Sequence, residues 1–283
     1  MNTTKGRIVW LSLFVLLVLT HIADAKIKVF SLVEKTQGAN LVLYGNVKEL
    51  HNDHIVLTVK KALKGSIPKS EVEVPWNKQI SMERMVVLYT LGEELLLFTS
   101  TTTSNGRYEP VYDWQGVLKL HKGDIGKYEE AISSIEKYDA ATSTEEITGR
   151  LISMLQSNNQ LVQNAALSDF MYSHCLKMLK AGIGEKELGP DVIKLTKHSD
   201  TNIAIKATYA LTNIGGKGSI PTLIELVGSD NDVISEMASR ALVNKTMVEK
   251  EVKRGSSIEE RKKIQAEWKE WWGKNKDKAK VRR

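Results

Sequence analysis

The sequence predicts an α+β protein: an N-terminal small antiparallel β-barrel, then a short α-solenoid of about three helical hairpins, then a C-terminal capping helix. Three observations lead to this order. Short segments of alternating polarity, separated by turn residues, fill residues 27–121. A sequence echo with an offset of 31 residues runs through residues 190–242. A single strongly marked amphipathic helix follows at residues 257–273.

Residues 1–25 have the features of an export signal. Lys5 and Arg7 precede an apolar run at residues 8–19, and Ala23 and Ala25 supply the small residues of a cleavage site. The run is shorter than the ~20 residues that span a bilayer, which disfavours the alternative of an uncleaved anchor. We therefore expect cleavage after Ala25. The rest of the chain has one cysteine and hence no internal disulfide, which favours export to a bacterial periplasm.

Residues 26–122 are expected to form the β-barrel domain. Ile55, Leu57 and Val59 share one face of an alternating segment, as in a half-buried strand. Closure of the sheet is expected because it removes exposed strand edges. The expected strands are residues 41–47, 54–60, 71–76, 85–89, 94–99 and 108–114.

Three phrases in this domain, at residues 40–47, 63–65 and 92–98, look like a small β-barrel of exported bacterial proteins. That barrel has an oligonucleotide-binding-like topology and resembles the netrin and metalloprotease-inhibitor modules. Inhibitor modules of that type carry disulfides and a cysteine N-terminus, which this chain lacks. The resemblance therefore implies the fold and does not imply inhibition.

A helical connector at residues 123–145 leads to repeats at residues 146–248, in units of roughly 146–184, 187–215 and 218–246. The first unit carries ten extra residues. Ordering the backbone of one unit costs about 30–60 kcal/mol, whereas its apolar side chains return about 12–24 kcal/mol when buried. The units are therefore expected to stack on one another. The echo pairs Pro190, Val192, Ile193, Leu195, Ile203, Ala207, Ala210 and Leu211 with Pro221, Leu223, Ile224, Leu226, Ile234, Ala238, Ala241 and Leu242.

These units resemble HEAT repeats, in which the second helix carries an aliphatic residue, an alanine and an Ala-Leu pair at spacings of four, seven and eight. The resemblance implies a stack of helical hairpins that presents a surface to another macromolecule. The family often has an arginine just after the aliphatic residue, where this chain has Gln163, Ala204 and Ser235.

Residues 249–273 contain the expected capping helix, which begins with the capping box Ser257–Glu260. Ile264, Trp268, Trp271 and Trp272 fall on one face, which predicts that they close the stack. The alternative is an aromatic platform for a ligand. Gly273 is the expected stop of this helix.

Residues 274–283 carry a net charge of +5 and are expected to be a disordered basic tail, capable of weak contact with an anionic envelope surface. Residues 250–283 hold 13 basic and 6 acidic residues, so the excess of positive charge lies at the C-terminal end of the chain. The basic residues of a nucleic-acid binding site would extend over a folded face or groove. We therefore expect no nucleic-acid partner.

No constellation of residues specifies a reaction, so no catalytic residue, cofactor or metal is expected. The turn at residues 51–54 and the segment 230–232 contain potential metal ligands, but a polar hairpin turn and acidic helix caps explain them. The glycines at 215–218 are too short a run for a phosphate loop and follow no strand.

The sequence thus favours an exported, non-catalytic scaffold that binds a protein or peptide. The expected contact residues are outward positions of the second helices and one face of the barrel: Gln163, Asn202, Lys206, Ser235, Ser239, Trp76, Tyr112 and Trp114. One alternative is an envelope-associated structural protein held by its basic tail. A lyase-like enzyme is a further alternative, because some bacterial HEAT-like proteins resemble phycobilin lyases, although those act inside the cell.

Overall fold

A computed structural model describes residues 29–75, 89–102, 106–168, 170 and 182–282. The chain divides into two compact units, Met1–Phe30 and Ser31–Arg283, and the elements below belong to the second unit. The expected export signal, Trp76, most of the expected strand at residues 85–89, and Cys175 lie outside the described residues.

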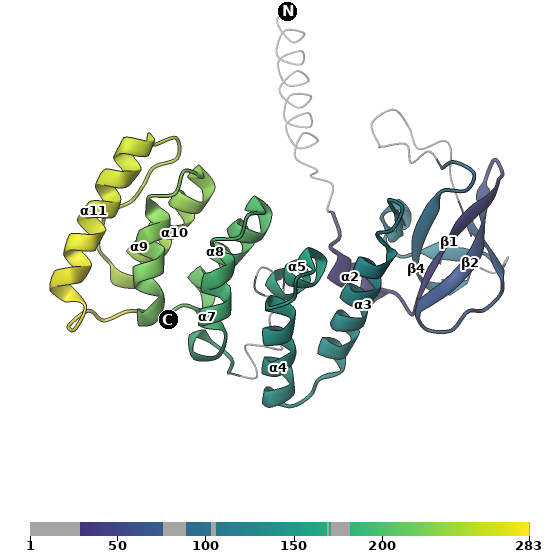
Figure 1. The fold of residues 1–283 in the computed structure, drawn as a ribbon, viewed down its shortest axis with the longest axis horizontal. Helices are drawn as coiled ribbons and strands as arrows, with labels where there is room; N and C mark the ends of the chain where they lie inside the picture. Colours follow the sequence, from purple (N-terminus) through teal and green to yellow (C-terminus); the bar gives the residue numbers. More distant parts are fainter. Residues whose placement is uncertain (1–28, 76–88, 103–105, 169, 171–181, 283) are drawn as a thin grey trace, which may run out of the picture. The chain divides into compact units, whose positions relative to one another are not determined.

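The described part of the N-terminal region forms an antiparallel sheet of six strands (Figure 1). The strand order is β3-β2-β1-β4-β5, and β6 also pairs with β4. At Gly45 the strands β1 and β2 approach so closely that a Cβ atom would lie 2.2 Å from the Thr58 carbonyl oxygen. The strands are β1 (Leu41–Leu50), β2 (His54–Lys64), β3 (Glu71–Pro75), β4 (Glu94–Thr102), β5 (Tyr108–Pro110) and β6 (Val117–Lys119).

At the central strands β1 and β4 both faces of the sheet are buried, because successive side chains alternate between two hydrophobic clusters. Leu43 and Leu97 are register partners in the first cluster, which also contains Ile55 and Leu57. The expected common face of Ile55 and Leu57 is therefore confirmed. The second cluster contains Val42, Tyr44, Leu96 and Phe98 from the strands and Ile132 from a helix.

The expected barrel is not formed: within the described residues the sheet follows an open path that ends at β3 and β5. Short outer strands account for this, since β3 has five residues and β5 has three. Side chains link these edges instead. Arg107 Nε lies 3.0 Å from Glu73 Oε2, and Arg107 Nη1 lies 2.7 Å from Asp53 Oδ2 in the β1–β2 turn. Hydrogen bonds with His54 and Arg107 lower the pKa of Asp53 to about 2.

The expected strand at residues 108–114 is wrong beyond Pro110. Tyr112 and Asp113 have φ angles of 55° and 59°, in the left-handed region, where a strand cannot continue. A short 3-10 helix, η1 (Asp113–Gly116), follows and leads into β6.

Two helices flank the second hydrophobic cluster of the sheet. The expected connector is α3 (Ile125–Ala140), whose residues Ile132, Ile135 and Tyr138 are buried. The other helix, α2 (Leu32–Gly38), is not among the predicted elements. It begins with a capping box formed by Ser31 and Glu34.

The remaining helices pack in consecutive pairs, α4 with α5, α7 with α8 and α9 with α10 (Figure 1). In the second and third pairs, the buried residues of the 31-residue echo belong to one hydrophobic cluster. The predicted common interior is therefore present in the described residues. The helices are α4 (Thr144–Leu155), α5 (Gln160–Ser168), α7 (Glu185–Leu195), α8 (Thr201–Ile214), α9 (Ile220–Val227) and α10 (Asp232–Thr246), with the 3-10 helix η2 (Lys217–Ser219) before α9.

The last helix, α11 (Ile258–Asn275), begins with the predicted capping box of Ser257 and Glu260 and packs against α9. Trp268 is fully buried, and Ile264, Trp271 and Trp272 pack against the same cluster, as expected of a capping helix.

The end of α11 differs from the prediction, because the helix runs through Gly273 to Asn275. Two backbone hydrogen bonds involve the residues that follow: Ala279 N donates to Asn275 O (2.8 Å), and Arg282 N donates to Lys245 O (3.0 Å).

Candidate functional site

The helices α8 and α10 begin with the same kind of side-chain N-cap, at positions 31 residues apart. The Asp200 side chain accepts hydrogen bonds from Asn202 N and Ile203 N, and the Asn231 side chain does the same for α10. Such caps satisfy backbone donors that have no partner inside the helix. Because both helices start at equivalent residues, side chains 31 residues apart occupy equivalent positions.

The buried sides of α8 and α10 are equivalent in this sense. Ile203 and Leu211 of α8 correspond to Ile234 and Leu242 of α10, and all four side chains are buried in the same cluster. Burial of this face leaves an opposite face of each helix for contact with other molecules.

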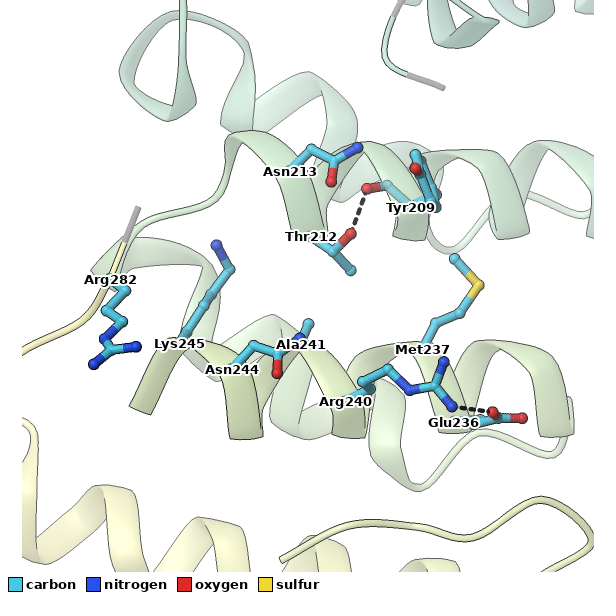
Figure 2. A pocket seen from close by; sticks show the side chains of 10 residues that line it. All are labelled: Tyr209, Thr212, Asn213, Glu236, Met237, Arg240, Ala241, Asn244, Lys245 and Arg282. Carbon is cyan, nitrogen blue, oxygen red and sulfur yellow. Dashed lines mark hydrogen bonds and ion pairs between the residues drawn. The ribbon is translucent and has the colours of Figure 1, made fainter. Parts of the chain in front are cut away.

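A groove of about 410 Å³ lies between α8 and α10, and we call it the α8–α10 groove (Figure 2). It is open to solvent, and both polar and apolar side chains line it. The lining residues are Tyr209, Thr212 and Asn213 from α8, Glu236, Met237, Arg240, Ala241, Asn244 and Lys245 from α10, and Arg282 from the C-terminal segment.

Two matching stripes of side chains flank the groove. On α8, residues 202, 206, 209 and 213 follow spacings of four, three and four, which place them on one helix face. Their equivalents on α10 are residues 233, 237, 240 and 244. The last pair in these stripes is Asn213 and Asn244, so an exposed asparagine recurs at the same position of both helices.

The two asparagines leave hydrogen-bonding groups available in the groove. Asn213 Nδ2 donates to the Phe170 carbonyl oxygen (3.0 Å), and its Oδ1 accepts no hydrogen bond within the described residues. The Asn244 side chain makes no hydrogen bond to any part of the chain that the structure describes. Both side chains are shown in Figure 2 beside the open space of the groove.

One end of the groove is cationic. Lys245 is buried, and its Nζ donates to the Gly215 carbonyl oxygen at the end of α8, where a positive charge is favourable. Burial lowers the pKa of Lys245, and the nearby Glu185 opposes this effect. Arg282 is exposed at the same end, and its guanidinium makes no ion pair within the described residues (Figure 2).

The other charges in the groove compensate one another. Arg240 Nη2 lies 2.7 Å from Glu236 Oε1, and Arg240 Nε lies 3.5 Å from Glu251 Oε1. Met237 and Tyr209 supply the apolar surface on facing walls (Figure 2). The groove therefore combines an apolar part, two amides and a cationic end.

Two of the predicted contact residues, Asn202 and Lys206, lie on the same face of α8 as the groove-lining Tyr209 and Asn213. Asn202 is exposed, whereas Lys206 is half-buried. Burial lowers the pKa of Lys206, and the Asp200 carboxylate opposes this shift.

Gln163, Ser235 and Ser239 do not lie on an outward face as expected, because all three side chains are buried. Gln163 Nε2 donates to Ser157 O, and Ser235 Oγ donates to Val227 O at the end of α9. Ser239 Oγ bridges the backbone of Lys250 and Val252. These polar side chains bond backbone groups inside the protein.

Ser239→Ala is expected to destabilise the protein without changing the groove. Ser239 Oγ accepts a hydrogen bond from Val252 N (2.7 Å), and Val252 is buried. An unpaired buried amide costs about 1–3 kcal/mol, which a urea titration should show as lower free energy of unfolding. The matched control is the exposed Ser199, where alanine should change that free energy by less than about 0.5 kcal/mol. Equal stability of the two variants would contradict the bridging role of Ser239.

The predicted contact residues of the β region do not line the groove. Trp76 lies outside the described residues. Tyr112 is exposed, and its hydroxyl donates to Glu34 O (3.3 Å), while Trp114 is half-buried in η1.

Sequence reasoning missed all ten residues that line the groove, because none of them is among the predicted contact residues. A signal for Met237 was present in the sequence, because the 31-residue offset carries the predicted contact residue Lys206 onto it. No comparable signal exists for Arg282, which reaches the groove through a contact distant in sequence.

Other kinds of site find little support in the described part of the chain. No group of three or more histidine, cysteine, aspartate or glutamate side chains there is placed to hold a metal ion. Among these residues, no helix has both the length and the apolar character needed to cross a membrane. Comparisons of the chain with protein-family profiles, characterised proteins and solved structures found no significant match.

Proposed function

We propose that this protein is an exported, non-catalytic scaffold that binds an extended peptide segment in the α8–α10 groove. The observation that carries this proposal is the recurrence of an exposed asparagine, Asn213 and Asn244, at equivalent positions of neighbouring helices. A peptide backbone offers one N–H donor and one C=O acceptor per residue. A side-chain amide can meet both, because it carries donors and an acceptor.

The spacing of the two helices suits such a ligand. Packed helices lie about 8–10 Å apart, which is the length of about three extended residues. A peptide crossing from α8 to α10 would therefore present successive backbone groups to Asn213 and Asn244. Met237 and Tyr209 offer contact to an apolar side chain of the peptide, and Arg282 offers an ion pair to an acidic group.

The remaining parts of the proposal rest on the sequence. The features of residues 1–25 support export to a bacterial periplasm. The 31-residue echo and the paired helices support an assignment of the helical region as HEAT-type repeats. Stacked repeats generally use their outward helix faces to bind other macromolecules.

The test is selection of peptides from a random displayed library on residues 26–283, followed by affinity measurement. The double variant Asn213→Ala/Asn244→Ala should weaken binding of the selected peptides about ten- to hundredfold, because about two hydrogen bonds of about 0.5–1.5 kcal/mol each are lost. Asn158→Ala is the matched control, since this exposed asparagine does not line the groove and should leave affinity unchanged. Failure to select any peptide, or equal affinity of the double variant, would contradict the proposal.

A further inference from the structure

The charges that line the α8–α10 groove are balanced at one end and unbalanced at the other. At the balanced end Glu236 pairs with Arg240 (2.7 Å), and Arg240 Nε also lies 3.5 Å from Glu251 Oε1. At the opposite end, no carboxylate of the described residues forms an ion pair with Lys245 or Arg282 (Figure 2). The uncompensated charge of the groove lining is therefore positive and is confined to this end.

Lys245 brings a buried positive charge to the cationic end. The residue is only 6% exposed, and its Nζ donates to the Gly215 carbonyl oxygen. The nearby Glu185 favours the charged form of Lys245 without forming an ion pair with it. Because a buried charge without a paired counter-charge is costly, an anion bound at this end of the groove would stabilise the Lys245 ammonium.

Arg282 supplies a group that can contact such an anion directly. Its guanidinium presents N–H donors in a planar fork, which matches the two oxygens of a carboxylate. The backbone beneath the side chain is held, since Arg282 N donates to Lys245 O (3.0 Å) and Val281 packs against the hydrophobic cluster of the helices. The side chain is therefore presented to the groove from an anchored position, which lowers the cost of binding.

The segment that carries Arg282 also limits how a peptide can lie in the groove. Its hydrogen bond to Lys245 O ties it to the end of α10, beside the cationic end of the groove (Figure 2). A peptide that runs along the groove from Tyr209 and Met237 meets this segment, and we expect the peptide chain to end there. The group at such a chain end is an α-carboxylate, which is ionised at neutral pH. Asn244 lines the same part of the groove and offers a side-chain N–H donor to it.

We propose that the α8–α10 groove recognises the C-terminal end of a protein or peptide, whose α-carboxylate binds the Arg282 guanidinium. This inference rests on the peptide binding proposed above, and it adds the direction of the bound chain and the group that is recognised. An apolar side chain close to the terminus packs between Tyr209 and Met237. Lys245 contributes its charge from within the groove wall.

The test begins with two synthetic pools of random octapeptides, which are identical except that one ends in a free carboxylate and the other in a carboxamide. Each pool is incubated with residues 26–283, and bound peptides are isolated by size exclusion and identified by mass spectrometry. The carboxylate pool should yield peptides whose affinity falls in Asn213→Ala/Asn244→Ala. Each should bind about tenfold or more weakly when it is resynthesised as the carboxamide, because a charge-assisted hydrogen bond is lost.

Arg282→Ala assigns this effect to the guanidinium. The variant should bind a selected carboxylate peptide about tenfold or more weakly, and it should bind the matching carboxamide as the unmodified protein does. It retains the backbone N–H that bonds Lys245 O, so the position of the segment is preserved. Lys280→Ala is the matched control, because this exposed basic residue of the same segment does not line the groove and should leave both affinities unchanged.

The outcomes separate this inference from the peptide binding on which it rests. Peptides that depend on Asn213 and Asn244 but bind equally with either terminus would overturn the inference and leave peptide binding in the groove supported. The inference is also wrong if Arg282→Ala weakens carboxylate and carboxamide forms alike, since an acidic side chain of the peptide is then the group recognised. If neither pool yields a bound peptide, peptide binding and this inference are both contradicted.

Discussion

Trp268→Ala should lower the free energy of unfolding by about 3–5 kcal/mol, the cost of deleting a fully buried large aromatic side chain. Trp268 has no exposed surface, and its Nε1 donates to the Lys250 carbonyl oxygen (2.8 Å). It also packs edge-on against Trp271, with ring centroids 5.5 Å apart. The expected loss is large because α11 covers the end of the hydrophobic cluster shared by the helical pairs.

Equilibrium urea unfolding, followed by circular dichroism, measures this effect. Lys269→Ala is the matched control on the same helix, because Lys269 is exposed and should change stability by less than about 0.5 kcal/mol. If Trp268→Ala lost less than about 1 kcal/mol, the interpretation of α11 as the cap of the helical core would be wrong.

Leu211→Ala and Leu242→Ala should each cost about 2–5 kcal/mol, because both leucines are fully buried at equivalent positions of α8 and α10. The more informative expectation concerns cooperativity. Each helical pair shares its interior with its neighbour, so either substitution should shift one common unfolding transition.

Fluorescence and circular dichroism, measured on the same urea series, distinguish the outcomes. Coincident transitions in both variants are expected, and the exposed Val233→Ala should leave the midpoint nearly unchanged. Two separated transitions in Leu242→Ala, with one matching the unmodified protein, would contradict a shared interior.

The order of elements could be predicted largely from local sequence. The repeat residues Ile203 and Ile234 are buried in one cluster, as the 31-residue offset indicated. The capping box of Ser257 and the tryptophan face after it were also sufficient to predict α11. These features depend on spacing within a helix, which the sequence displays directly.

Three predicted contact residues, Gln163, Ser235 and Ser239, are buried, because the polarity of a residue does not by itself determine which face of a helix it occupies. Ser235 and Ser239 are serines on a helix, which suggested exposure, yet their 31-residue equivalents Ala204 and Thr208 are buried too. The serines are tolerated inside because each bonds a backbone group from outside α10. Only the folded arrangement reveals those partners.

Other differences have the same origin in contacts distant along the chain. The hydrogen bond from the Arg282 amide to the Lys245 carbonyl at the end of α10 has no signal in the sequence, although Arg282 lines the groove. The open sheet could not be foreseen either, because the alternating polarity of the sequence does not show that the outer strands β3 and β5 are only five and three residues long. By contrast, α2 had a readable signal in the Ser31–Glu34 capping box.

Methyl spectra of the methionines test the central claim, occupancy of the α8–α10 groove by a peptide, most directly. Met237 is half-buried in the groove wall, whereas Met247 is exposed and does not line the groove. Residues 26–283 carrying ¹³C-methyl methionine would be titrated with a selected peptide, with signals assigned from Met237→Leu and Met247→Leu. The account predicts a shift of the Met237 signal and an unchanged Met247 signal. A shift at Met247 alone, or binding of the peptide that leaves Met237 unchanged, would contradict it.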